Sequence, residues 1–368
     1  MRTPCSATGA AALLAAALLP PLAPALRAQP TAQPTAQPTA PAAAPTAAAR
    51  APFTVDDALD VATWSIAALS DDGRWLAATS ATRREGLGVD HRREGDPSYV
   101  RPQRLRLWAV ETATGARRAV LPEARVLREP TWSPDGARLA FLLHENGAFV
   151  PAVWERAGGR LTRLPLGDGR RPAENGALEW TRDGSALVLA VRPRDWPGRV
   201  AERFRTLTAG PVLVQASTEP FLAWDDLRRE GNRRAVVRLD VATRRVTELV
   251  PEGLVVAWQL ADDGRSIAWT TDVTPRTDYA EIFGVEQRLV ARALDGRSGA
   301  PTGPERVLVP SLKGATLAWA RDGRRFAVGR EGRVHVGTVD LGASIAASGG
   351  ASGGAPGDTT PAAGAAAA

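Results

Sequence analysis

One short motif recurs along the chain: an Asp-Gly pair that follows an apolar residue and precedes a run of mostly apolar residues. In the clearest copy, Ser133-Pro134-Asp135-Gly136, serine can hydrogen-bond the backbone, proline fixes φ, and glycine suits the fourth position of a type I turn. The apolar residues Leu139, Phe141 and Leu143 then recur with the period of a strand. Each copy therefore predicts a β-hairpin. The copies are Leu69–Thr79, Thr131–Leu142, Glu179–Ala190, Gln259–Thr270 and Trp319–Gly329.

A second hairpin follows most copies of the motif, for example at Arg104–Leu121, Val150–Leu166 and Ala235–Val250. Two hairpins make a four-stranded antiparallel unit, and repetition of such a unit is typical of β-propeller blades. We therefore predict an all-β fold, a β-propeller of about five four-stranded antiparallel blades. The predicted blades span about 62–122, 129–168, 176–250, 254–312 and 315–342.

The last unit shows only three clear strands, so the sequence predicts an open or incomplete ring. The long interval between Gly184 and Gly264 predicts an insertion, roughly Arg192–Gly231, with a short helix at Trp224–Glu230. Large aromatic rings share a place just before the turn, where they can fill the wedge between neighbouring blades. We favour this core role over a ligand platform, because aromatic side chains dominate the buried area of cores. These residues are Trp132, Trp180, Trp258 and Trp319.

The two ends differ in composition from the middle. Residues 1–28 are similar to a signal peptide, with Arg2, an apolar run at Gly9–Leu22 and a small residue, Ala28, at the expected cleavage site. The alternative is an uncleaved alanine-rich tail. We expect an exported protein, periplasmic or extracellular, with a Pro/Thr/Ala-rich linker at 29–50, a propeller domain at 51–342 and a disordered Gly/Ser/Ala-rich tail at 343–368.

The formal net charge is +6, which raises the question of nucleic-acid binding. The basic residues, all arginine except Lys313, are scattered among the acidic ones and form no stripe with interleaved aromatics. This pattern argues against nucleic acid as a partner. The apolar run near the N-terminus is too short and too interrupted by proline to cross a membrane as a helix, so we predict no membrane span.

Nucleophilic and metal chemistry find little support in the sequence. Gly350–Gly354 matches G-x-S-x-G in letters, but it lacks the strand–turn–helix context of a nucleophile elbow. The three histidines, His91, His144 and His335, are far apart, and the single cysteine, Cys5, lies in the expected signal peptide. We predict no catalytic residue, no metal site and no cofactor, and we expect His335 to be an outward-facing strand residue.

Paired aspartates and tyrosines also have simpler explanations. Asp71-Asp72 and Asp262-Asp263 lie in the repeated turn, where aspartate suits the geometry, and neither they nor Asp225-Asp226 show the spacing of a calcium loop. In a propeller sialidase, a residue separates Asp from Gly in the repeat, whereas the two are adjacent here. Only Tyr99 and Tyr279 are present to serve as a tyrosine nucleophile.

The Trp-Ser-Pro-Asp-Gly segment at 132–136 resembles the repeats of TolB-type periplasmic proteins and of the N-terminal propeller of the prolyl oligopeptidase family of serine peptidases. Three further segments are similar to secreted bacterial members of that family: Phe53–Leu59, a short helix leading into the first strand, Asp90–Pro102 and Pro220–Arg238. The resemblance covers about 52–341. In that family, the propeller gates the active site and contributes substrate contacts.

The chain departs from the family where catalysis would occur. Family members carry the nucleophile, acid and histidine in an α/β-hydrolase domain after the propeller, and the sequence here turns into the low-complexity tail at Gly342. The adjacent glutamates of dipeptidyl peptidases are absent as well. Three hypotheses remain open: a non-catalytic module that binds a peptide or protein at the axial face, a truncated serine peptidase whose hydrolase domain is missing, and an enzyme in its own right, such as a lyase or hydrolase.

Overall fold

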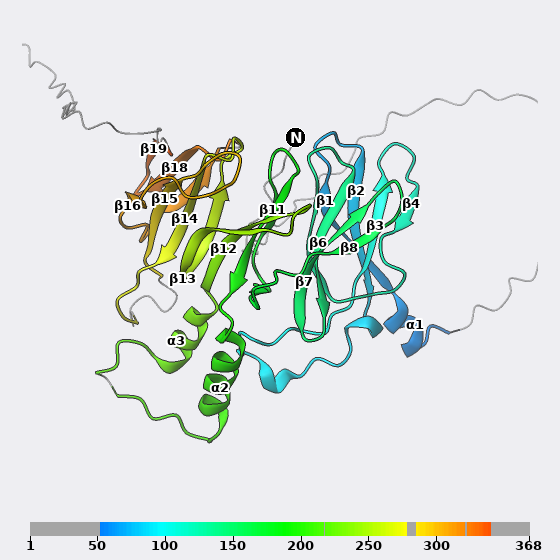
Figure 1. Cartoon of the computed structure of the whole chain (residues 1–368). Coiled ribbons are helices and arrows are strands. Elements are labelled where there is room, and N and C mark those ends of the chain that lie inside the picture. Colours follow the sequence, from blue (N-terminus) through cyan, green and yellow to red (C-terminus); the bar gives the residue numbers. More distant parts are fainter. Residues whose placement is uncertain (1–51, 217, 278–284, 321, 340–368) are drawn as a thin grey trace, which may run out of the picture.

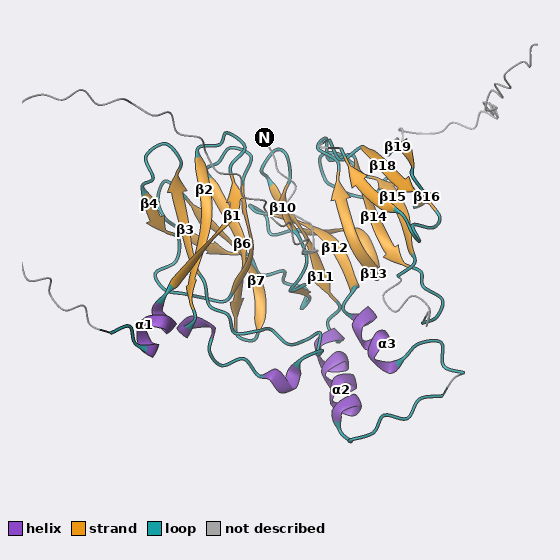
Figure 2. Cartoon of the chain, turned by 180° about the vertical axis from the view of Figure 1, so that it is seen from behind, coloured by secondary structure: helices purple, strands orange, loops and turns teal. Residues whose placement is uncertain are grey.

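The structure is a computed structural model that describes residues 52–216, 218–277, 285–320 and 322–339 (Figure 1). The expected signal peptide at 1–28, the linker at 29–50, the tail at 343–368, and the candidates Tyr279 and Gly350–Gly354 lie outside the described residues. Five antiparallel sheets stand side by side in chain order (Figures 1 and 2). The prediction of an all-β propeller with about five blades is therefore confirmed.

The first two sheets each have four strands in sequential order. The first contains β1 (Ala62–Leu69), β2 (Trp75–Thr82), β3 (Arg106–Glu111) and β4 (Arg117–Ala119). The second contains β5 (Leu127–Trp132), β6 (Arg138–Glu145), β7 (Ala148–Glu155) and β8 (Leu161–Arg163).

The third and fourth sheets share one long strand, β13 (Val246–Leu260), which pairs with β12 through its first half and with β14 through its second. The third sheet contains β9 (Arg171–Pro172), β10 (Leu178–Trp180), β11 (Ala186–Arg192) and β12 (Arg233–Asp240) beside β13. The fourth adds β14 (Ser266–Asp272), β15 (Gln287–Ala293) and β16 (Arg306–Val309). The fifth contains β17 (Thr316–Trp319), β18 (Arg325–Arg330) and β19 (Arg333–Thr338).

Helices lie outside the sheets. The short α1 (Val55–Asp60) leads into β1 and starts with a reciprocal cap between Thr54 and Asp57. The predicted insertion between β11 and β12 contains α2 (Trp196–Thr208) and α3 (Ala223–Glu230), and α3 confirms the predicted helix at Trp224–Glu230. Figure 1 shows both helices below the sheets, on the side away from the Asp-Gly corners. Single turns of 3₁₀-helix, η1 (Arg84–Gly86) and η2 (His91–Arg93), lie in the loop after β2.

All five Asp-Gly corners have the same backbone hydrogen bond, in which the glycine N–H donates to the carbonyl three residues earlier. The glycines Gly73, Gly136, Gly184, Gly264 and Gly323 adopt φ between 64° and 71°, a region that side chains with a Cβ disfavour. In the first three corners a hydroxyl also binds the aspartate, as Ser70 Oγ does to Asp72 at 2.6 Å. The corner motif therefore encodes its turn locally.

Gly73 and Gly323 offer a matched test of these corners. A Cβ at Gly73 meets nothing within 4 Å, whereas a Cβ at Gly323 would approach the Leu260 carbonyl oxygen of the fourth sheet to 2.5 Å. We expect Gly73→Ala to lower the free energy of unfolding by about 1 kcal/mol, the cost of the left-handed backbone. Gly323→Ala should cost about 1–3 kcal/mol more because the sheets must separate. Urea unfolding measures both, and equal losses would contradict the close packing of the corners.

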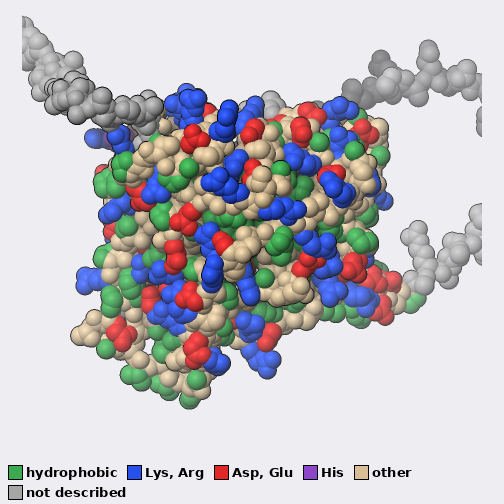
Figure 3. All heavy atoms as spheres, viewed as in Figure 1, with side chains coloured by type: hydrophobic (Ala, Val, Ile, Leu, Met, Phe, Trp, Pro, Cys, Tyr) green, Lys and Arg blue, Asp and Glu red, His purple; other side chains and the backbone are tan. Residues whose placement is uncertain are grey.

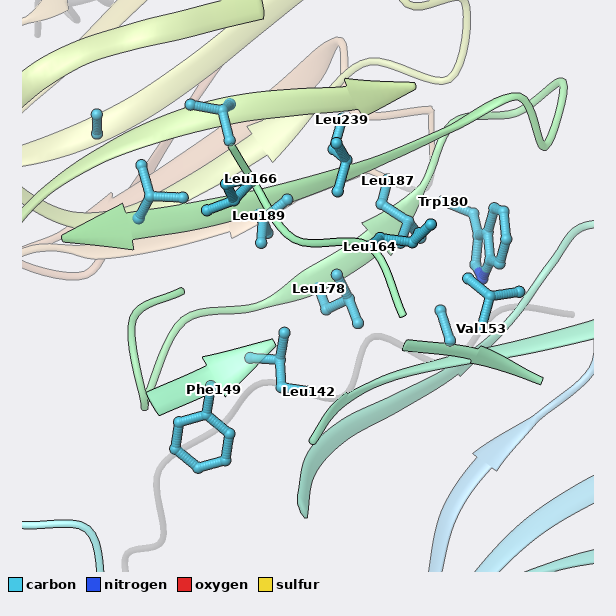
Figure 4. Close-up of a cluster of buried hydrophobic side chains, with 14 residues drawn as sticks. Leu142, Phe149, Val153, Leu164, Leu166, Leu178, Trp180, Leu187, Leu189 and Leu239 are labelled. Carbon is cyan, nitrogen blue, oxygen red and sulfur yellow. The ribbon is translucent and has the colours of Figure 1, made fainter. Parts of the chain in front are cut away.

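Neighbouring sheets pack through apolar side chains. One cluster joins the first and second sheets, another the second and third (Figure 4), and two more continue to the fourth and the fifth. The outer faces of the two end sheets have no such cover. Trp64 and Ile66 on β1 are 48% and 75% exposed, and Val334 and Val336 on β19 are 70% and 76% exposed. Over the described residues, the stack of sheets is open.

All four tryptophans pack against core clusters, as predicted, but Trp258 does not occupy the repeat position of the other three. Trp132 and Trp180, each four residues before the corner glycine, are buried between sheets, and Trp319 packs against Phe326. The equivalent residue of the fourth sheet is Leu260, not Trp258. Trp258 lies two residues earlier on β13, where it pairs with Trp269 across the same sheet.

Candidate functional site

The three histidines lie on separate elements of the fold, as predicted. His91 lies in η2, His144 near the end of β6, and His335 is exposed on β19, which confirms its expected place on an outward-facing strand. No group of three or more His, Cys, Asp or Glu side chains that could hold a metal ion occurs among the described residues. The prediction that the chain has no catalytic residue stays a prediction.

The remaining candidates have structural roles. Asp72 accepts hydrogen bonds within its corner, and Asp225 and Asp226 stand in the first turn of α3, where carboxylates favour the helix dipole. The Tyr99 hydroxyl accepts a hydrogen bond from the Asp90 N–H at 2.7 Å, and Arg93 lies over its ring. Tyr99 therefore holds the long loop after β2 together.

A polar cluster that the sequence analysis missed lies at the strand ends next to the inserted helices. It joins side chains from the second and third sheets and contains more arginine than carboxylate. We call it the polar cluster; it consists of Arg128, Glu129, His144, Glu174, Arg192 and Arg234.

Glu129 occupies a strained part of β5. Its φ is 52°, in the left-handed region, and the pairing register of β5 with β6 shifts between Arg128 and Thr131. Residues in this backbone state cost of order 1–3 kcal/mol and occur preferentially at binding and catalytic sites. The Glu129 side chain is exposed, yet the surrounding protein raises its pKa through desolvation. The Glu129 side chain therefore reaches solvent while neighbouring protein groups surround part of it.

Arg192 is the buried centre of the cluster. Its Nη1 donates to the carbonyls of Gly231 at 2.7 Å and Arg233 at 3.0 Å, and its Nε and Nη2 lie 3.3 Å from Glu174 Oε2. Its guanidinium lies 4.0 Å from the centre of the Trp196 ring. Arg192 thus ties the inserted helices to β11, because Gly231 caps α3 and Trp196 begins α2.

Arg234 is buried and donates to carbonyl groups: its Nε donates to Val255 at 2.6 Å, and its Nη atoms donate to Val256 and Asn175. Burial and the nearby Arg192 lower its pKa to about 10, so the group stays charged at neutral pH. Within the described part of the chain, no carboxylate forms an ion pair with it. Its positive charge therefore favours anionic groups near the polar cluster.

His144 lies between the cluster and the core. Its ring meets Phe149 edge to face at 5.2 Å. Burial lowers its pKa below the ordinary 6.5, and the charges of Arg128 and Arg125 act in the same direction, against Glu174. Because the pKa is lower in the folded state, the unfolded chain binds protons more readily below about pH 6.5.

We therefore expect stability to decrease as the pH falls through the unfolded-state pKa of His144 toward its folded-state pKa. His144→Gln should remove that part of the pH dependence. The measurement is urea unfolding of both proteins at about pH 7.5 and about pH 5. Both proteins should also lose some stability through the carboxylates that they share. An equal decrease in the free energy of unfolding in the two proteins would contradict the role of His144.

On the face that Figure 3 shows, neither sign of charge dominates. Arginine and acidic side chains are interspersed there, and no broad patch of one colour appears. Among the described helices, none is both long and apolar enough to cross a membrane.

No family model and no curated protein sequence matches this chain. Solved structures do match. They include TolB from Acinetobacter baumannii, with 14% identity, a TM-score of 0.41 and coverage of 76% of this chain and 52% of that one. The acylaminoacyl peptidase of Pyrococcus horikoshii matches with 12% identity, a TM-score of 0.44 and coverage of 76% and 38%.

The propeller domain of the Trilobed protease from Pyrococcus furiosus matches with 13% identity, a TM-score of 0.40 and coverage of 70% of this chain and 60% of that one. Its structure has an open velcro topology. The chain thus spans between 38% and 60% of the length of these three proteins. The fold is similar to TolB-type propellers and to the propellers of peptidases related to prolyl oligopeptidase.

Proposed function

We propose that the chain is an exported, non-catalytic propeller module that binds a peptide or protein at its axial face, at the polar cluster. The observation that carries the proposal is the strained bulge at Glu129, which presents Arg128 and Glu129 on the side of the second sheet where the Arg128 charge acts on His144. Such strain persists only where the surrounding structure holds it, and it is frequent at ligand sites.

The excess of arginine over carboxylate in the cluster sets the chemistry of the ligand. A guanidinium binds carboxylates in a forked geometry, so the ligand should present an acidic side chain or a free C-terminal carboxylate. Arg128 is suited to this contact because, within the described residues, its guanidinium donates only to the neighbouring Leu127 carbonyl, at 2.9 Å. Glu129 would then select a basic group at a neighbouring ligand position.

The test uses fluorescence anisotropy with libraries of acidic, neutral and basic peptides on the purified chain. Acidic peptides should bind, and Arg128→Met and Glu129→Gly should each weaken binding about tenfold, a change of 1.4 kcal/mol. Arg182→Met, on the corner side, is the control and should bind as the wild type does. Mass spectrometry should recover the peptides uncut. Absence of binding by every library, or wild-type affinity in both cluster variants, would refute the proposal.

A further inference from the structure

A cavity of about 320 Å³ opens between the third and fourth sheets, on the corner side. At the other junctions, the Asp-Gly corner of one sheet lies against the corner of the sheet before it. A Cβ at Gly136 would lie 3.7 Å from Ser70 of the first sheet, and one at Gly184 would lie 3.7 Å from Pro134 of the second. At Gly264 the only near atom is the Gly296 carbonyl oxygen, which belongs to the same sheet. Among the five described sheets, this junction therefore lacks the corner-to-corner contact, although an apolar cluster still joins the two sheets.

Two substitutions within the repeat explain the cavity. Trp132 packs against Trp75 with ring centres 6.4 Å apart, and Trp180 packs under the Arg138 guanidinium at 4.7 Å. At the third–fourth junction the tryptophan position holds Leu260, and the position of Trp75 and Arg138 holds Ala186. The two side chains that fill the space between sheets at the other junctions are thus both replaced by smaller ones here. Protein interiors are otherwise packed to crystal-like density, so a gap of this size at a repeated contact is unusual.

The wall of the cavity combines apolar and charged groups. Val188, Leu249 and Leu294 are buried and form its apolar part. Arg238 also lines it; its Nη2 donates to Ser185 Oγ at 3.0 Å, and its Nη1 lies 3.8 Å from Asp240. Gly299 keeps the space open, because a Cβ there would approach Arg238 Cδ to 2.7 Å.

Arg238 has donors left for a ligand. Its side chain is only 13% exposed, and a guanidinium has five N–H donors, of which one donates to Ser185 Oγ within the described part of the chain. A carboxylate is the anion that best fits such a fork. On the rim, the exposed Asp262 can attract a positive charge. Apolar wall, guanidinium and acidic rim together match a small molecule with an apolar body, a carboxylate and an ammonium group.

We propose that this cavity binds a free α-amino acid with an aliphatic or aromatic side chain. The carboxylate contacts Arg238, the side chain packs on Leu260 and Leu294, and the ammonium group faces Asp262. The volume lies at the lower end of small-molecule sites, which favours one amino acid over a longer peptide. The site lies at the opposite ends of the strands from the polar cluster, so the inference does not depend on the proposed peptide-binding function.

The test is calorimetric titration of the purified chain with L-leucine and L-phenylalanine. Their decarboxylated analogues, 3-methylbutylamine and 2-phenylethylamine, remove the carboxylate, and glycine removes the apolar side chain. We expect the two amino acids to bind and each analogue to lose at least about tenfold in affinity. Arg238→Met should cause a similar loss.

Leu260→Trp restores the repeat residue and should fill the cavity, abolishing binding while the melting temperature stays equal or rises. Leu69→Trp makes the same change at the equivalent position of the first sheet, where the side chain is 45% exposed, and should leave binding intact. Arg128→Met, in the polar cluster, should also bind normally. Absence of binding by both amino acids in the wild type, or unchanged affinity in both Leu260→Trp and Arg238→Met, would overturn the proposal.

Discussion

Replacing Trp154 by alanine should lower the free energy of unfolding by about 3–5 kcal/mol, the range for large-to-small changes at buried aromatic residues. Trp154 is 1% exposed on β7, within the cluster that joins the first and second sheets. Its ring packs under the Arg118 guanidinium at 5.4 Å. The loss combines the transfer of the ring to water with the void left between two sheets. Urea unfolding followed by circular dichroism measures it.

Trp64 provides the matched control for that experiment. It is 48% exposed on the open face of the first sheet, where its main aromatic contact is Trp108 at 5.7 Å. Trp64→Ala should cost only about 1 kcal/mol, the value of one aromatic pair. A loss as large as that of Trp154→Ala would mean that another part of the chain covers this face.

Replacing Arg192 by leucine should be equally damaging, at about 3–5 kcal/mol, because it leaves Glu174 and two partly buried carbonyls without their donor. The inserted helices should also loosen, since Arg192 contacts both Trp196 and the end of α3. Hydrogen exchange in α2 and α3 should therefore rise more than exchange in the first two sheets.

Arg203 serves as the control in the same insertion. It pairs with Asp226 across α2 and α3, but the two side chains are 39% and 33% exposed. Arg203→Leu should cost less than about 1 kcal/mol, because partly exposed ion pairs contribute little. If both variants behaved alike, Arg192 would not be the anchor of the insertion.

The architecture was predictable because the corner chemistry is local. Aspartate and glycine at fixed turn positions specify a hairpin whatever lies around them, and five copies along the chain specify the sheets. The helix α2 was not predicted, although Trp196, Val200 and Phe204 recur at helical spacing and are buried. The segment lies outside the strand repeats, and a count of apolar spacing over the insertion predicts the helix.

The polar cluster and the cavity were less accessible to sequence reasoning. The cluster brings together residues as distant as Arg128 and Arg234, with no common spacing, so only the packing of the second and third sheets reveals it. The cavity did leave a signal. Counting four residues back from Gly264 gives Leu260, and aligning the repeats by their glycines, not by the nearest tryptophan, would have shown the missing ring.

The fold described above is an open stack of sheets whose two end faces are exposed over the described residues. Thiol labelling tests it directly, because Cys5 is the only cysteine of the chain. In a Cys5→Ser background, single cysteines at Ile66 and Val336 should react with a maleimide nearly as fast as in the unfolded chain. A cysteine at Leu139, which is 0% exposed, should be protected. Protection of Ile66→Cys and Val336→Cys to the level of Leu139→Cys would show a closed ring and contradict the account.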